Sequence, residues 1–297
     1  MKEYIIVTDS TTDLPSEYVK MHGLRVVPLR FIIDDKNYRD FPDKRELSAE
    51  HFYSMIKEGK TVKTSQPNPE EFYNVFRSVL DLGYGILGIF FSSGLSGTFN
   101  SARIAKDQII DENPEAPIIV IDSLCASLGE GLLVHYALKA KDEGMCLTDL
   151  ADYVENLKLK IAHWYTIADM DTLKRGGRIS ASSAFFAKTL NINPVLHVSN
   201  DGKLIAKMKK IGRKNALNAL VDKMVETYLP DENEVIFISH SCSESDVVKI
   251  VEMIKQKTGI NNFLINDVGP VIGAHCGVGT IAIFYLANER WSYFFQK

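Results

Sequence analysis

Cysteine is scarce in this sequence, and so are long apolar runs. The four cysteines, Cys125, Cys146, Cys242 and Cys276, lie too far apart for a CxxC pair, a zinc pattern or a disulfide framework. Such cysteine usage is typical of a reducing compartment. No apolar run approaches the roughly 18 residues of a membrane-spanning helix, and the run near the N-terminus is too short for a signal peptide. We therefore expect a soluble, cytoplasmic protein.

A basic excess is also lacking. The sequence has 34 lysines and arginines and 38 aspartates and glutamates, which gives a net charge of −4 at pH 7. Aromatic residues are scattered rather than grouped beside basic clusters, so a nucleic-acid-binding role is disfavoured. The sequence has neither a GxxxxGK[ST] loop nor a GxGxxG motif after a strand, so we expect no ATP site.

What the sequence does contain is enough for roughly two domains, with 297 residues of which 45% are hydrophobic. Strand and helix patterns alternate through residues 1–160, which predicts a mainly parallel sheet with helices on both faces. Residues 161–297 add a hairpin pattern around Asn200-Asp201-Gly202 to further alternation, which predicts a mixed sheet. The expected fold is α/β, with two domains that meet at residues 160 and 161.

The central stretch, residues 86–102, is rich in small hydroxyl residues. Its apolar beginning predicts a buried strand that stops at Ser92. Ser93 and Ser96 follow between glycines, and a helical pattern starts at Thr98. A strand, a short polar loop and a helix N-terminus together are typical of an anion-binding pocket in an α/β sheet. An ordinary turn that uses serine and glycine for capping is the alternative.

A second hydroxyl-rich segment is TSQP at residues 64–67. Its proline and Pro69 make the segment extended and rigid, so the hydroxyls of Thr64 and Ser65 have little freedom to lose on binding. This favours a binding loop. Capping of the next helix is the alternative.

Residues 173–180 form the compact basic segment of the chain. Gly176 and Gly177 separate Arg175 from Arg178, which lets the backbone bend and leaves both guanidinium groups available. Such an arrangement suits recognition of a phosphate or a carboxylate. A solvated surface turn is the alternative.

Two further segments combine glycine or aspartate with polar side chains. Residues 269–280 contain four glycines and His275, which predicts a loop whose histidine either donates to an anionic oxygen or has a structural role. Asp9 and Asp13 lie in the polar run at residues 8–15. Because a magnesium or calcium site needs more oxygen ligands, we expect these two aspartates to cap the chain and bond the loop.

These segments carry a family resemblance. In chain order they are TDSTTDLP at 8–15, TSQP at 64–67, SSGLSGT at 92–98, LKRGGRIS at 173–180 and GPVIGAHCGVGT at 269–280. INPVL at 192–196 and DGKL at 201–204 fit as well. The sequence thereby resembles, over its whole length, the DegV family of bacterial fatty-acid-binding proteins, with one departure at Val278, where the family usually reads GPGT.

The resemblance implies a long-chain fatty acid, such as palmitate or oleate, in a tunnel between two α/β domains. It implies that Thr64, Ser96 and Ser93 hold the carboxylate, together with His275. Family members of the fatty acid kinase type present the acid to a separate ATP-dependent kinase subunit, which makes an acyl phosphate for phospholipid synthesis. Arg178 is implied to face that subunit. We therefore expect a lipid-binding carrier rather than an enzyme, with no cofactor and no metal.

The chemistry of the residues agrees with this resemblance. Hydroxyls, loop amides and an imidazole bind a carboxylate without a full counter-charge, and each buried methylene of a tail contributes about 0.8 kcal/mol. The rival hypothesis is a hydrolase or acyltransferase with Ser93 or Ser96 as nucleophile and His275 as base. It is weaker because Gly97 directly follows Ser96, unlike GxSxG, and no acidic residue lies in the histidine loop.

Overall fold

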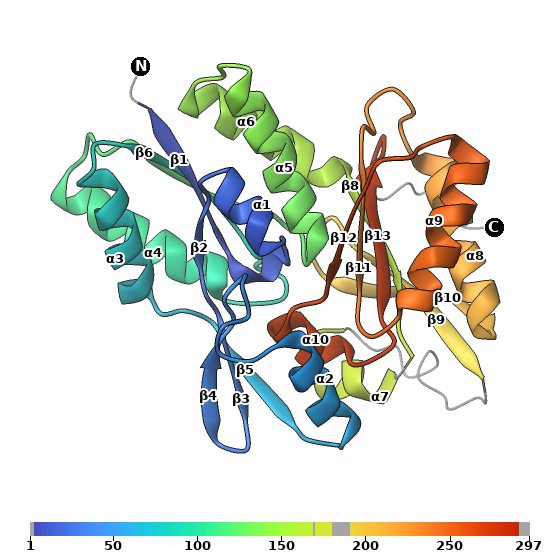
Figure 1. Ribbon diagram of the computed structural model, residues 1–297. Coiled ribbons are helices and arrows are strands. Elements are labelled where there is room, and N and C mark those ends of the chain that lie inside the picture. The colour runs from blue at the N-terminus through green and yellow to red at the C-terminus, as the bar shows by residue number, and fades with distance from the viewer. Residues whose placement is uncertain (1–2, 169, 180–190, 291–297) are drawn as a thin grey trace.

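The strands form three sheets within the part of the chain that the computed structural model describes, residues 3–168, 170–179 and 191–290. Two larger sheets lie side by side, with helices between and outside them (Figure 1). A small three-stranded sheet lies below the first of them in this view. The α/β class predicted from the sequence is confirmed. No helix of the described ranges is both long enough and apolar enough to cross a bilayer.

The first sheet has four parallel strands in the order β2-β1-β6-β7. The strands are β1 (Tyr4–Asp9), β2 (Arg25–Val27), β6 (Gly85–Phe90) and β7 (Ile118–Asp122). Every residue of β6 is buried, as expected of a central parallel strand with both faces covered. The predicted parallel sheet is therefore confirmed.

Alternate residues of this sheet pack against two different helix pairs. One face packs against α3 (Pro69–Leu80) and α4 (Thr98–Glu112), through side chains such as Phe72, Phe76 and Phe90. The other face packs against α5 (Leu128–Asp142) and α6 (Leu147–Leu157). The short segments η1 (Ser10–Thr12) and α1 (Ser16–Met21) follow β1, and η2 (Lys158–Lys160) follows α6.

The second large sheet has six strands in the order β10-β9-β8-β13-β11-β12. They are β8 (Ile161–Thr166), β9 (Ile192–Val198), β10 (Leu204–Ile211), β11 (Ile236–His240), β12 (Phe263–Asp267) and β13 (Ile281–Leu286). β11 and β12 are parallel and the other pairs are antiparallel, so the predicted mixed sheet and hairpin are confirmed. The outer face packs against α8 (Arg213–Thr227) and α9 (Glu244–Thr258).

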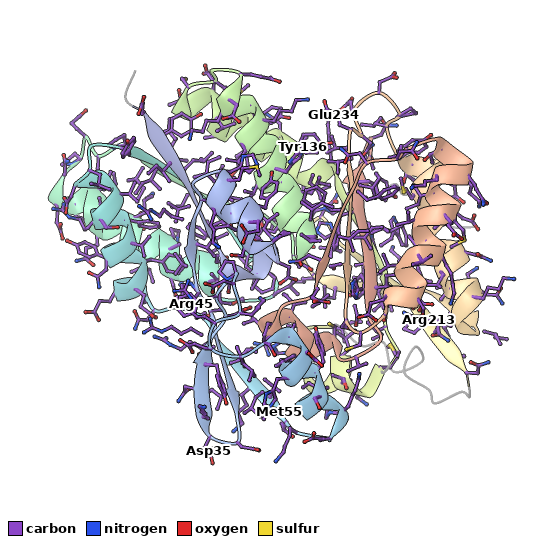
Figure 2. All side chains as sticks on the ribbon, viewed as in Figure 1. Asp35, Arg45, Met55, Tyr136, Arg213 and Glu234 are labelled. Carbon is purple, nitrogen blue, oxygen red and sulfur yellow. The ribbon has the colours of Figure 1, made fainter. Side chains whose placement is uncertain are left out.

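Helix α5 lies between the two large sheets (Figure 1) and packs against strands of both. Its Tyr136 points toward the turn before β11, close to Glu234 (Figure 2), and donates a hydrogen bond to the carbonyl of Glu232 (3.0 Å). The strands up to residue 122 and those from residue 161 belong to different sheets. Because α5 belongs to both cores, the division into domains at residue 160 stays a prediction.

The third sheet was not predicted. It is antiparallel, in the order β4-β3-β5, and consists of β3 (Arg30–Ile33), β4 (Lys36–Arg39) and β5 (Val62–Ser65). The apolar residues of 24–33 have the pattern of a single strand, but the chain leaves the first sheet after β2. Pro28 lies at this break, where its ring removes a backbone donor that a continuous strand would use. Helix α2 (Ala49–Lys57) packs on this sheet, with Ser48 as its N-cap.

Two segments expected to be loops contain helices. Residues 270–276 form α10 (Pro270–Cys276), with Pro270 in its first turn and Gly277 at its end with φ +72°. The basic segment begins inside α7 (Met170–Arg175), and Ser180 lies outside the described residues. The glycines of residues 269–280 predicted a loop, but residues 270–276 are helical, and α10 packs against α2 and the third sheet.

Candidate functional site

A cavity of about 300 Å³ lies where the three sheets, α5, α7 and α10 meet. Its wall is mostly apolar, and the apolar lining consists of Leu29, Phe91, Leu95, Ala126, Tyr165, Leu173, Val198, Leu204, Val268, Val271, Ile272, Cys276, Ala282 and Phe284. The polar lining consists of Thr64, Ser65, Gln66, Ser96, Ser127, Arg178, Ser239, His275 and Thr280. An apolar pocket with few polar groups suits a ligand with a long apolar part and one polar end.

Thr64 and His275 meet at this cavity although 211 positions separate them. Thr64 Oγ1 and His275 Nε2 are 2.8 Å apart, a hydrogen bond between β5 of the third sheet and α10. Burial, with a smaller contribution from the charge of Arg178, lowers the pKa of His275 to about 4. The imidazole is therefore neutral at pH 7 and acts as a hydrogen-bonding group rather than a counter-charge.

Ser96 also lines the cavity, directly before α4. Its hydroxyl lies 2.8 Å from Thr98 Oγ1 and accepts from the Thr98 backbone N–H (3.3 Å), so Ser96 supports the first turn of the helix. Gly97 fits tightly here, because a Cβ at this position would lie 2.3 Å from Gln66 Oε1. Ser96 therefore bonds the first residue of α4, whose N-cap is Gly97, and also lines the cavity.

Ser93 differs from the expectation. Its side chain is exposed and does not line the cavity, and its backbone N–H donates to Asp122 Oδ1 (3.0 Å). The neighbouring Ser92 is the buried serine of the pair, and its hydroxyl donates to the carbonyl of Gly202 (2.8 Å). Neither serine of this pair lines the cavity.

Arg178 combines an exposed position with a place in the cavity lining. Its guanidinium group donates to the carbonyl of Gly176 (2.8 Å) and to that of Leu95 (3.4 Å). The arginine therefore lies at the mouth of the cavity and faces both inward and outward. Gly176 is required nearby, because a Cβ there would lie 2.6 Å from His275 Nδ1.

Four acidic side chains are buried near the cavity, and only two of them, Asp9 and Asp13, were noted from the sequence. We call the side chains of Asp9, Asp13, Asp40 and Glu130 the buried acid cluster. Asp9 accepts from the backbone N–H of Thr11 (2.9 Å), the capping role expected from the sequence. Burial raises the pKa of Asp9 to about 6 and that of Glu130 well above its ordinary value. Glu130, buried on α5, gave no sequence signal.

Asp13 connects the cluster to the cavity. Its carboxylate accepts from the hydroxyl of Ser127 (2.5 Å) and from the backbone N–H of Gly269 (2.9 Å), the residue that precedes α10. Ser127, which lines the cavity, adopts φ +53°, a strained conformation for a residue other than glycine. Asp13 therefore fixes the start of α10, the helix that carries His275.

Comparisons with known proteins were made for the whole chain. A family model described as an uncharacterised protein of the DegV family matches residues 3–288. A DegV domain-containing protein of Clostridium perfringens is 38% identical over 290 residues, which cover 98% of this chain and 99% of the relative.

Among solved structures, a fatty-acid-binding DegV family protein from Thermus thermophilus is 30% identical, with a TM-score of 0.86 over 97% of this chain and 100% of that one. DegV from Bacillus subtilis, a fatty acid binding protein, is 27% identical, with a TM-score of 0.81 over 97% of this chain and 100% of that one.

Proposed function

Because this chain belongs to the DegV family, we propose that it binds a long-chain fatty acid. The observation that carries the proposal is the apolar cavity with the Thr64–His275 hydrogen bond in its wall. The tail would occupy the apolar part of the cavity, and the carboxylate would lie near Thr64, Ser96, His275 and Arg178, which we call the head site. Fatty acid binding by the relatives from Thermus thermophilus and Bacillus subtilis supports this assignment.

The head site suits a carboxylate for a chemical reason. With the proton on Nε2, His275 donates to Thr64, and the threonine hydroxyl proton is left for the ligand. The hydroxyl of Ser96 offers a second donor, and the guanidinium group of Arg178 places a positive charge at the mouth. Each methylene buried in the cavity would add about 0.8 kcal/mol, so the tail would dominate affinity and the head site would set orientation.

We further propose that the bound acid is presented to a separate ATP-dependent kinase subunit, which would form an acyl phosphate. The absence of a GxxxxGK[ST] loop from the sequence and the exposed position of Arg178 beside the cavity support this division of labour. Such a carrier would work in the cytoplasm, where ATP is available. Trapping acyl phosphate with hydroxylamine tests the proposal: product should require ATP, the kinase subunit and this protein together.

The serine-nucleophile hypothesis receives no support from the geometry. Ser93 is exposed, Ser96 is bonded to Thr98, and the imidazole of His275 is bonded to Thr64 rather than to a serine. A serine hydrolase needs its histidine within hydrogen-bond reach of the nucleophile.

Native mass spectrometry of the purified protein tests fatty acid binding. We expect one fatty acid per chain, released by solvent extraction. Leu204 lines the cavity, whereas the next residue, Ile205, does not. A tryptophan in place of Leu204 would fill space for the tail, so Leu204→Trp should lose the ligand and Ile205→Trp should keep it. A wild-type protein that carries no acid and takes up no added palmitate or oleate would refute the proposal.

A further inference from the structure

A histidine and two carboxylates come together at one edge of the second large sheet, away from the cavity lining. His240 ends β11 and Asp267 ends β12, and these two residues are paired directly in the parallel register. Glu244 is the first residue of α9. The three side chains therefore lie on two adjacent strand ends and a helix start, which are regular elements that hold their positions.

The spacing of the three groups is close to that of metal ligands. One ligand atom from each residue lies within 4.8 Å of the other two, and His240 Nδ1 lies 3.7 Å from Asp267 Oδ1. Bonds of about 2.0–2.1 Å to a tetrahedral zinc ion place its ligand atoms about 3.4 Å apart. The 3.7 Å between His240 Nδ1 and Asp267 Oδ1 is close to this ligand–ligand distance. Glu244 is exposed, so its side chain is able to rotate inward.

The polar groups at this edge have unmet bonding capacity. His240 is 8% exposed, and its Nδ1 is buried without a hydrogen-bond partner within the described residues. Across the same ranges, neither Glu244 nor Asp267 forms an ion pair with a lysine or an arginine. The ammonium group of Lys44 is bonded to Asp40 (2.7 Å), and it interacts with Asp267 only through its charge. A buried imidazole nitrogen thus faces one carboxylate and has a second carboxylate beside it.

We propose that His240, Glu244 and Asp267 bind a divalent transition-metal ion of the zinc type, with water completing the coordination. One imidazole nitrogen and two carboxylate oxygens suit zinc, whereas magnesium and calcium prefer an all-oxygen set. The ion would connect β11, β12 and the start of α9. Because Gly269 follows Asp267 by two residues, the ion would also brace the segment that leads into α10.

Titration calorimetry of protein stripped with EDTA and returned to metal-free buffer tests the site. Zinc should bind one ion per chain, and cobalt should give the visible bands of a tetrahedral complex. His240→Gln and Asp267→Asn should weaken zinc binding at least tenfold. Glu244→Gln changes an exposed side chain, so it should fold normally and still weaken binding. The exposed His51 on α2 supplies the control, His51→Gln, which should bind as the wild type does.

A thermal-shift measurement gives a second readout, since zinc should raise the melting temperature of the wild type but not of His240→Gln. Free thiols are the competing zinc ligands, and Cys242 is the nearest in sequence. Binding that persists in all three site variants, or that is lost only in Cys242→Ser, would overturn the assignment. So would a wild-type protein that binds no zinc. None of these outcomes depends on whether the cavity holds a fatty acid.

Discussion

The head site includes His275 near the end of α10, whereas the buried acid cluster is bonded to the start of that helix through Asp13, and the two regions use their polar groups differently. At the head site, Thr64 is hydrogen-bonded to His275, and Ser96 is hydrogen-bonded to the side chain and the amide of Thr98. Both residues line the cavity. In the acid cluster, Asp9 accepts from the hydroxyl and amide of Thr11 and from the amide of Phe91. Polar groups with spare capacity beside a cavity serve a ligand, whereas Asp9 is bonded by the chain on both carboxylate oxygens and holds the fold. In the same cluster, Asp40 Oδ2 is buried without a hydrogen-bond partner among the described residues.

The head site and the buried acid cluster also differ in where their positive charge lies. Burial lowers the pKa of His275 and raises the pKa values of Asp9 and Asp13, so both regions favour neutral side chains. The cluster has an internal cation, Lys44, which binds Asp40 at 2.7 Å. The cation of the head site, Arg178, is exposed at the mouth. Substitutions in the cluster should therefore change stability, whereas those in the head site should change affinity.

The largest effect is expected for Lys44→Met, which removes the cation beside two buried carboxylates. We expect the free energy of unfolding to fall by about 3 kcal/mol at pH 7, because an uncompensated buried charge is left behind. The loss should be smaller at pH 5, where the carboxyl groups take up protons. Urea unfolding at both pH values measures it. Lys60→Met, which removes an exposed partner of Asp34, is the control and should change stability little.

A smaller effect, seen in pH dependence, is expected for Asp13→Asn. An unfolded aspartate has a pKa of about 3.9, and burial raises the pKa of Asp13 to about 7 in the folded protein. Between these values the folded protein binds more protons, so this residue makes the free energy of unfolding fall as pH rises from about 4 to 7. Asn has no such titration, so the variant should gain stability relative to the wild type as pH rises. Parallel urea-derived stability curves from pH 5 to pH 7.5 would contradict this assignment.

At the head site, Thr64→Val should weaken fatty acid binding about tenfold, equivalent to about 1.4 kcal/mol, because one hydrogen bond to the carboxylate is lost. The shape of the side chain is kept, so the free energy of unfolding should change by less than about 1 kcal/mol. Displacement of a fluorescent fatty acid measures the affinity. Thr61→Val, an exposed threonine just before β5, is the matched control. A loss of stability without a loss of affinity would place Thr64 with the structural groups instead.

The sequence was sufficient for the parts of the fold that depend on local pattern. The buried strand β6, the helices α3 and α4 and the hairpin of β9 and β10 follow from apolar spacing and from Asn200-Asp201-Gly202. The third sheet was missed because its register pairs Arg30 with Ser65, a contact that no local pattern reveals. Helix α10 was missed because its glycines predicted a loop. Gly273 within the helix allows close packing, since a Cβ there would lie 2.5 Å from the Tyr53 hydroxyl.

The site was predictable to a similar degree. Hydroxyl-rich and glycine-rich segments pointed to Thr64, Ser96 and His275, and all three line the cavity. Ser93 does not line the cavity, because it lies in the turn after β6 with an exposed side chain, and the sequence alone does not fix that direction. Asp13 could be noticed, but its partners Ser127 and Gly269 lie 114 and 256 positions away. Long-range hydrogen bonds of this kind require the tertiary structure.

The smallest effect is expected for Arg178→Gln, which tests how far the head site depends on charge. The arginine is exposed, so solvent screens it, and affinity for the fatty acid should fall only about two- to fivefold. The loss should shrink further as ionic strength rises. The pKa of His275 should rise from about 4, because the charge of Arg178 is one of the causes that lower it, and NMR titration of the histidine measures the change.

Arg175→Gln is the matched control, since this neighbouring arginine does not line the cavity. An empty cavity in Arg178→Gln would make the guanidinium group the main anchor of the carboxylate. An unchanged affinity together with an unchanged His275 pKa would leave Arg178 only the role implied by the sequence, contact with a kinase subunit. A modest, salt-dependent loss means that one arginine serves both the bound acid and the surface where that acid would be presented.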